Sequence, residues 1–457
     1  MTIKTLLLAI AFVVAAGMPA QAQEAQDPAL PAILDLRERA ALRDAWLTRR
    51  LETVVPKLMA REKVDMWVLI AREYNEDPVL ETMLPATWMS ARRRTILLFH
   101  RLDDGSLERL SVSRYAVGEL FEAAWTPEEQ PDQWARLAEI VAARDPETIA
   151  VNRSADFPLA DGLTDTEAAA LENALGERYA SRLVSGENLA VGWLETRIPE
   201  EMAVYPQIVR LAHSIIAEGL SERVITPGVT TANDVMWWYR QRIRELALRA
   251  WFHPSVSIQR NAAEAQGEAG STAMTDLFAN ANPNVIRPGD LLHIDFGIDY
   301  LGLNTDTQHH AYVLRPGESE APAGLKAGLA KANRLQDLLL ANFEAGASGN
   351  AILARTRAEA IAAGLTPSVY SHPIGYHGHG AGGSIGMWDD QDGRPGPGEY
   401  PIRPDTAWSI ELNVEAEVPE WGGQVVRFML EEDAYFDGEA VRYLDGRQTR
   451  FHLIPRP

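Results

Sequence analysis

The chain has 457 residues, a length that accommodates two domains. Its 43 basic and 64 acidic side chains give a formal net charge of −21, which argues against nucleic acid and anionic membranes as partners. The chain has no cysteine, so disulfides, thiolate metal sites and cysteine nucleophiles are excluded.

The first 22 residues are predicted to be an export signal. Lys4 provides a positive charge, and residues 6–17 form an apolar run that is too short to span a bilayer. The sequence AQA at 20–22 fits the small-x-small cleavage rule, so the mature chain would begin at Gln23. No later segment is apolar enough to span a membrane. We therefore expect the mature protein in the periplasm or outside the cell.

The next part of the chain predicts an α/β domain over residues 30–190. Residues 30–62 have helical patterning with many charges, and residues 165–177 form another helical stretch. Four apolar runs of strand length lie between them, at 66–71, 95–100, 109–113 and 148–152. Alternation of helices and strands is typical of this class of domain.

The remaining residues, 191–457, predict a different architecture. A helix should begin at Pro199 and continue to about Val224. A second helix should begin after Thr231, with Trp237, Trp238 and Tyr239 in the core. A hairpin, two further helical stretches and a second hairpin follow, with the later helices at about 323–343 and 349–363. The order helix, helix, hairpin occurs twice, which indicates an internal duplication of about 120 residues.

A ten-residue sequence motif occurs twice, once in each predicted hairpin. Residues 286–295 read IRPGDLLHID and residues 402–411 read IRPDTAWSIE, so each copy ends in an acid. A second acid follows each copy, Asp306 after the first and Glu432 after the second. A Gly/His cluster, HPIGYHGHGAGG at 372–383, lies between the copies. Four carboxylates and a histidine on related hairpins predict a two-metal hydrolytic site.

Hairpin pairing explains why the acids of each pair should meet. The midpoint between Asp295 and Asp306 falls between Tyr300 and Leu301, where the turn is expected. Simple pairing then places the two acids directly opposite one another, with Cβ atoms about 5 Å apart. Like charges at this distance repel each other, and a cation between them reverses the sign of that interaction.

The same pairing argument applies to the second hairpin, which has a longer loop. The midpoint between Glu411 and Glu432 falls inside PEWGGQ (419–424), so these acids are also predicted to face one another. Glu431 is the alternative, although adjacent residues point to opposite faces of a strand. Four carboxylates carry a charge of about −4, which two divalent ions would neutralise. Oxygen-rich ligands with one imidazole suit manganese, zinc, cobalt or iron.

Together, these motifs resemble the pita-bread metallopeptidases: methionine aminopeptidase, aminopeptidase P, prolidase and their relative creatinase. In that family the metal ligands follow the order Asp, Asp, His, Glu, Glu on a duplicated α+β fold. The resemblance implies that the metal ligands here are Asp295, Asp306, His379, Glu411 and Glu432. It covers about residues 190–457, and the preceding domain is similar to the creatinase/prolidase N-terminal domain in pattern and position.

The histidine ligand is the ambiguous member of this set. Both His377 and His379 fit a His-x-x-Gly spacing, and the flanking glycines favour His379. The family has a further histidine a few residues downstream of the ligand, and none is present in GSIGMWDD (383–390). His309 stands where the family commonly has an arginine. Proton transfer and substrate binding are therefore expected to differ from the familiar members.

The function implied by the resemblance is a dinuclear, metal-dependent exopeptidase acting on the N-terminal peptide bond of short peptides. Manganese is the favoured metal, with zinc, cobalt or iron as alternatives. Glu411 is expected to act as general base as well as ligand, and His372 or His377 to stabilise the intermediate or transfer a proton. A preference for Xaa-Pro is expected from the aminopeptidase P and prolidase branch only, and a homodimer is an open alternative.

Two other functions compete with this one. The first is a creatinase-like hydrolase that needs no metal, and the second is a non-catalytic binding or scaffold protein that keeps the pita-bread fold. The complete set of five ligand positions argues against both. Metal analysis of the purified protein separates them, because near-zero bound metal would favour either alternative.

Overall fold

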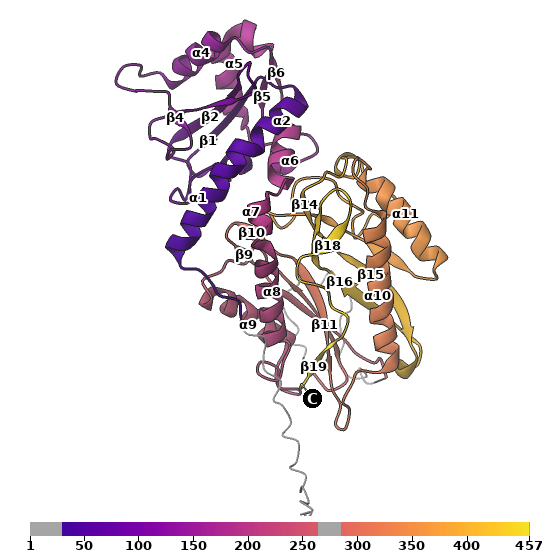
Figure 1. The fold of residues 1–457 in the computed structure, drawn as a ribbon. Coiled ribbons are helices and arrows are strands. Elements are labelled where there is room, and N and C mark those ends of the chain that lie inside the picture. The colour runs from indigo at the N-terminus through magenta and orange to yellow at the C-terminus, as the bar shows by residue number, and fades with distance from the viewer. Residues whose placement is uncertain (1–29, 264–284, 457) are drawn as a thin grey trace, which may run out of the picture.

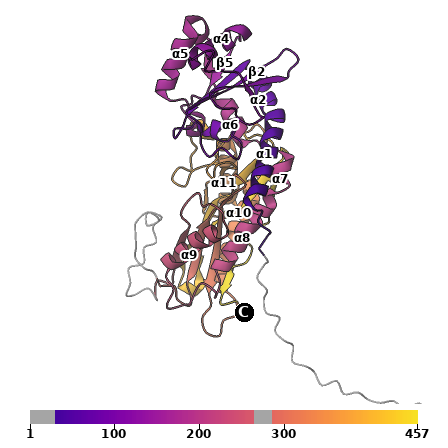
Figure 2. The same ribbon diagram turned by 90° about the vertical axis from the view of Figure 1, so that its left-hand side faces the viewer.

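The computed structural model describes residues 30–263 and 285–456 (Figures 1 and 2). The predicted export signal at 1–22 lies outside these residues. Within the described parts of the chain, no helix combines the length and apolar character needed to cross a bilayer.

The first part of the chain forms a six-stranded sheet in the order β4-β3-β2-β1-β5-β6. Its strands are β1 (Met66–Arg72), β2 (Arg94–Arg101), β3 (Leu107–Ser113), β4 (Glu122–Ala123), β5 (Ile149–Val151) and β6 (Leu183–Ser185). Strand β1 pairs antiparallel with β2 and parallel with β5, so the sheet is mixed. The four strands predicted from apolar runs are confirmed.

Helices cover both faces of this sheet. They are α1 (Leu36–Thr53), α2 (Val55–Glu62), α3 (Pro78–Glu81), α4 (Gln133–Arg144), α5 (Asp165–Ala180) and α6 (Glu187–Glu195). Side chains of β1 alternate between the faces: Val68 is buried in the core beneath α4 and α5, whereas Trp67 is buried in the core shared with α1, α2 and α6. Burial on both faces explains why the strands are continuous apolar runs. The α/β prediction for this part is confirmed.

Five α-helices lie in the described residues of the second part of the chain, shown from magenta to orange in Figure 1. They are α7 (Pro199–Met202), α8 (Tyr205–Gly219), α9 (Ala232–Glu245), α10 (Ala323–Asn342) and α11 (Gly349–Ala362). The predicted long helix from Pro199 is divided in two, with Pro206 in the first turn of α8. Thr231 caps α9 in a capping box with Asp234. Of the three aromatic residues predicted to be core, Tyr239 is fully buried and Trp238 packs against the core, whereas the prediction is wrong for Trp237, which is 60% exposed.

The strands of this part lie beside the helices and pair antiparallel, except that the last strand, His452–Ile454, pairs parallel with Thr307–Val313. The first set comprises β7 (Ser255–Gln259), β8 (Leu291–Phe296), β9 (Asp299–Tyr300), β10 (Leu303–Asn304), β11 (Thr307–Val313) and β19 (His452–Ile454). The second comprises β12 (Pro367–Val369), β13 (His372–Ile374), β14 (Thr406–Ser409), β15 (Leu412–Val418), β16 (Gln424–Leu430), β17 (Asp433–Phe436) and β18 (Val441–Tyr443). Helices α8 and α9 precede the β8–β11 hairpin, and α10 and α11 precede the β15–β16 hairpin. This order confirms the duplicated architecture.

Candidate metal centre

The first hairpin brings Asp295 and Asp306 to the same face, although not as a directly opposed pair. Gln308 is the residue opposite Asp295. The turn consists of Leu301 and Gly302, whose φ angles of 62° and 80° are those of a tight two-residue hairpin turn. The predicted turn lay one residue too early, so the predicted pairing is wrong. Asp306 is two residues from Gln308 and therefore keeps its side chain on the same face.

The second hairpin decides between two adjacent glutamates. Its loop spans 419–423, and the β15–β16 ladder leads directly to Glu411 on one strand and Glu431 on the other. An odd number of loop residues shifts the register by one position from the predicted one. Since side chains alternate along a strand, the shift turns Glu431 toward Glu411 and turns Glu432 away. The structure thus corrects the prediction that Glu432 faces Glu411.

Glu431 connects the carboxylates with a histidine. Oxygens of Asp295, Asp306 and Glu431 lie within 4.8 Å of one another, and so do ligand atoms of His372, Glu411 and Glu431. Because Glu431 belongs to both groups, these five residues form a single unit, called here the acid–histidine cluster. It has the composition predicted from the sequence, with His372 and Glu431 in place of His379 and Glu432.

The imidazole of His372 is held with one nitrogen directed at the acids. Its Nδ1 lies 3.1 Å from the carbonyl oxygen of Pro373, to which it donates. Its Nε2 lies 3.5 Å from Glu431, 3.8 Å from Asp306 and 4.0 Å from Glu411. A backbone carbonyl at Nδ1 fixes the tautomer and presents the Nε2 lone pair, as in histidines that bind metals.

The cluster contains polar atoms that protein contacts do not satisfy. The Oδ1 atoms of Asp295 and Asp306 and the Nε2 of His372 are buried and lack a hydrogen-bond partner within the described residues. Buried polar atoms without partners are costly, and three of them within one cluster of acids suit a cation. Carboxylate oxygens and one imidazole nitrogen are donors that divalent transition metals accept. The residues therefore fit a divalent metal site.

Electrostatics favour the same conclusion. Burial raises the pKa of Asp306 well above its usual range, and the charges of Glu431, Asp295 and Glu411 raise it further. Burial and the charge of Glu431 also raise the pKa values of Asp295 and Glu411. Without a cation these acids resist ionisation together, whereas a divalent ion would stabilise their ionised forms.

These shifts predict how stability of the metal-free protein depends on pH. A carboxyl whose folded pKa is raised is protonated in both states below its unfolded pKa, near 4. Above that pH the unfolded chain ionises first, so stability falls by about 1.4 kcal/mol per pH unit for each such group until the folded pKa is reached. Asp306→Asn removes one such group, so in chelator the variant should be more stable than wild type by a margin that grows as the pH rises from about 4 toward the raised folded pKa of Asp306.

Thermal or urea denaturation in the presence and absence of chelator measures this margin. With metal bound, wild type should be more stable than Asp306→Asn, because it gains metal-binding energy that the variant lacks. Asp103→Asn, at an exposed position, is the matched control and should show no growing margin. A constant difference between Asp306→Asn and wild type across this pH range would contradict the prediction.

Gln308 is a site residue that sequence reasoning missed. Its Nε2 donates to Glu411 at 2.8 Å and to Glu431 at 2.7 Å, while its Oε1 lies 2.9 Å from His293 Nε2. Ser409 also donates a hydrogen bond to Glu431. These contacts orient the two glutamates, which is how residues behind metal ligands act. The signal available in the sequence was position, since Gln308 is two residues beyond Asp306 on the same strand face.

The two histidines of the glycine-rich segment have separate surroundings. His379 is exposed, and its ring lies edge-on to His372 with centroids 4.9 Å apart. It forms a possible ligand group with Asp306 and His372. His377 belongs to no such group among the described residues. Burial lowers the pKa of His377 to about 4, and the charge of Arg197 contributes in the same direction.

Close packing explains the glycines beside His379. A Cβ on Gly378 would lie 2.3 Å from the ring of Trp251, and a Cβ on Gly380 would lie 2.6 Å from the carbonyl oxygen of Pro373. These glycines are required by backbone approach rather than by metal binding. The spacing His-x-x-Gly also occurs at His372, followed by Gly375, so it was the signal that could have identified His372 as the central histidine.

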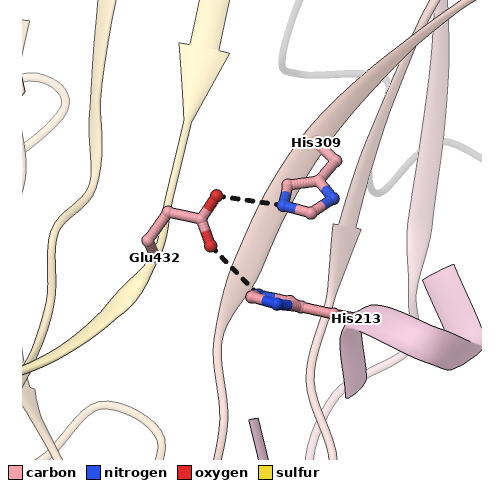
Figure 3. A group of neighbouring side chains, drawn as sticks. All are labelled: His213, His309 and Glu432. Carbon is pink, nitrogen blue, oxygen red and sulfur yellow. Dashed lines mark hydrogen bonds and ion pairs between the residues drawn. The ribbon is translucent and has the colours of Figure 1, made fainter. Parts of the chain in front are cut away.

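Glu432 lies in a different environment. Its carboxylate is 3.0 Å from the Nε2 atoms of both His213 and His309 (Figure 3). Burial raises the pKa of Glu432, but the charges of His309 and His213 outweigh it and lower the pKa to about 2. Burial lowers the pKa of His213, but hydrogen bonds to Asp445 and Glu432 outweigh it and raise the pKa to about 10.

Comparison with known proteins places this site in a family. The model described as Metallopeptidase family M24 matches residues 207–434, which contain the whole acid–histidine cluster. No curated protein matches the sequence.

Solved structures share the fold. An X-Pro aminopeptidase from Thermotoga maritima MSB8 aligns with a TM-score of 0.59 and 15% identity, covering 87% of this chain and 99% of that one. A dipeptidase from Mycobacterium ulcerans aligns with a TM-score of 0.57 and 15% identity over 93% of this chain and 100% of that one. An Xaa-Pro dipeptidase from Bacillus anthracis aligns with a TM-score of 0.54 and 16% identity, covering 92% of this chain and 100% of that one.

Proposed function

The chain belongs to metallopeptidase family M24, and from that premise we propose that it is a dinuclear exopeptidase that cleaves the N-terminal peptide bond of short peptides. The observation that carries this proposal is the convergence of five donor residues with three buried, unpartnered donor atoms. The proposed metal ligands are Asp295, Asp306, His372, Glu411 and Glu431.

Manganese is the metal that we propose for this site. Four of the five side chains offer oxygen and one offers nitrogen, a set that suits manganese and also accepts zinc, cobalt or iron. A charge of about −4 in a largely buried cluster calls for two divalent ions. When bound, such ions polarise a carbonyl oxygen and lower the pKa of water, which is the chemistry that peptide hydrolysis requires.

Exposure and position suggest roles for the protein's own groups. The side chain of Glu411 is 22% exposed, whereas that of Asp306 is 5% exposed and that of Glu431 is 1% exposed. Glu411 and Asp295 are the partly exposed carboxylates of the cluster, and we assign the role of proton acceptor to Glu411 as the resemblance implies. His379 is exposed beside His372 and is the histidine that we assign to proton transfer or carbonyl binding. This assignment replaces the predicted catalytic roles of His372 and His377.

The position of His379 also resolves an apparent departure from the family pattern. With His372 as the ligand, His379 lies a few residues downstream of it, where the family has its further histidine. The sequence had seemed to lack that residue only because His379 was itself predicted to be the ligand.

Aromatic residues beside His379 support an apolar second residue in the substrate. The ring centroids of Trp251 and Tyr370 lie 5.2 Å and 6.2 Å from that of His379. Rings of this kind pack well against the apolar ring of proline. We therefore propose Xaa-Pro peptides as the preferred substrates.

Contacts with the N-terminal domain support a limit on substrate length. Arg50 on α1 lies 4.8 Å from the ring centroid of Tyr376, and the Tyr376 hydroxyl donates to Glu201 at 3.2 Å. Tyr376 is three residues from His379, so the N-terminal domain packs against the segment that carries the proposed catalytic histidine. A long polypeptide would meet this domain before reaching the acids.

Export completes the proposal. The sequence of residues 1–22 supports cleavage of a signal and a location in the periplasm or outside the cell.

Hydrolysis of defined peptides tests the proposed function. The manganese-loaded protein should cleave Ala-Pro or Xaa-Pro-Xaa tripeptides and should not cleave their N-acetylated forms. Acetylation removes the free N-terminus that defines the substrate of an exopeptidase of this kind. Release of the N-terminal residue is followed by chromatography, with and without chelator.

A denatured protein such as casein and tripeptides without proline are the comparison substrates. Efficient cleavage of casein or of the acetylated peptides would rule out the exopeptidase assignment. Equal rates for tripeptides with and without proline would retain that assignment and remove the proline preference.

A further inference from the structure

The face of β11 opposite the acid–histidine cluster carries a second group of metal-binding side chains. The backbones of Gln308 and Glu431 exchange hydrogen bonds of 3.0 and 3.3 Å, and both side chains point to the acid–histidine cluster. The next residues along each segment, His309 and Glu432, point to the other face because side chains alternate. The backbone thus separates the two groups.

Three donor atoms converge on this second face. Glu432 Oε1 lies 3.0 Å from His309 Nε2, and its Oε2 lies 3.0 Å from the Nε2 of His213, which α8 supplies (Figure 3). One ligand atom from each residue lies within 4.8 Å of the others. Zinc binds nitrogen and carboxylate oxygen at about 2.0–2.2 Å, so neighbouring donors of a tetrahedral site lie about 3.3 Å apart. The two carboxylate–imidazole distances of 3.0 Å, which end on different oxygens of Glu432, are close to this value.

An outer layer of residues orients these donors. The Nδ1 of His213 lies 3.1 Å from Asp445, and the Nδ1 of His309 lies 3.2 Å from His452 Nε2. The backbone N–H of Gln448 donates to Glu432 Oε1 at 2.6 Å. Metal-binding histidines almost always have such a partner at the second nitrogen, which fixes the tautomer and leaves the other nitrogen for the ion.

We propose that His213, His309 and Glu432 bind one divalent ion of the zinc type, separate from the ions of the peptidase site. Two imidazoles and one carboxylate are a known zinc ligand set, and three protein ligands leave a fourth position for water. The His213 side chain is 16% exposed, which gives solvent access, whereas that of Glu432 is fully buried. The ion would connect α8, β11 and the segment after β16.

Metal content decides between this proposal and a hydrogen-bonded network that contains no ion. The experiment uses the full chain with Asp306→Asn and His372→Ala, which disable the peptidase site, so it does not depend on the proposed function. The double variant is first stripped of metal with chelator and then incubated with zinc. Elemental analysis should find one bound zinc per chain. On titration with cobalt, the visible absorption of the protein should stop increasing at one ion per chain. Zinc should raise the melting temperature.

Substitutions then assign the ion to these residues. Adding His213→Gln should weaken zinc binding by at least about a hundredfold, and His452→Gln, which removes an outer partner, by about tenfold. His100→Gln is the matched control, because His100 lies 3.7 Å from a single acid, Glu108, and should change nothing. Circular dichroism confirms that each variant is folded.

The result that would overturn the proposal is a double variant that binds no zinc at saturating concentration. Zinc binding that is unaffected by both His213→Gln and His309→Gln would overturn it equally, because the ion would then lie elsewhere. In wild type, the total metal should exceed that of His213→Gln by one ion per chain, and equal totals would contradict the assignment.

Discussion

Glu431→Gln should abolish peptide hydrolysis, whereas the same substitution at its neighbour Glu432 should not. Glu431 lies within 4.8 Å of donors from both halves of the acid–histidine cluster, so the amide removes a charge that both metal positions use. We expect kcat/KM to fall by more than about a hundredfold, beyond the 10–100-fold typical of residues behind a ligand. Bound manganese should decrease in parallel.

The comparison with Glu432→Gln makes this result specific. That variant loses ion pairs with His213 and His309 on the other face, so its melting temperature should fall. Its kcat/KM, assayed where circular dichroism shows a folded protein, should stay within about tenfold of wild type. If Glu432→Gln lost hydrolysis while Glu431→Gln kept it, the register-based assignment would be wrong.

His372→Ala should release metal from the peptidase site, and this is the second large effect that we expect. Its Nε2 is buried, unpartnered within the described residues and 3.5 to 4.0 Å from three carboxylates. Removing the imidazole leaves a site of carboxylates alone, so manganese affinity should fall by about a hundredfold or more. Titration with manganese, followed by calorimetry, measures this change.

The other two histidines of the segment provide the contrast. His379→Ala should retain manganese but lower kcat, because His379 is exposed at the edge of the cluster. His377→Ala should alter neither strongly, since His377 belongs to no group of possible metal ligands among the described residues. Loss of metal from His379→Ala with full retention by His372→Ala would return the ligand role to His379.

Sequence alone determined the elements and the chemistry of this protein. Apolar runs of four to eight residues located the main strands, and the cap at Thr231 located the start of α9. The repeated ten-residue motif indicated that Asp295, Asp306 and Glu411 belong to one site, and the structure brings these three together. Local patterns suffice here because the strand period and the turn residues are properties of short segments.

Tertiary structure alone decided which neighbouring residue takes each remaining place. The loop at 419–423 shifts the register by one position, and a shift of one exchanges the faces of Glu431 and Glu432. The fold of the glycine-rich segment places His372 buried beside three carboxylates and leaves His379 exposed next to it. Loop geometry and packing of this kind depend on contacts between residues far apart in the sequence, so spacing within a motif could not fix them.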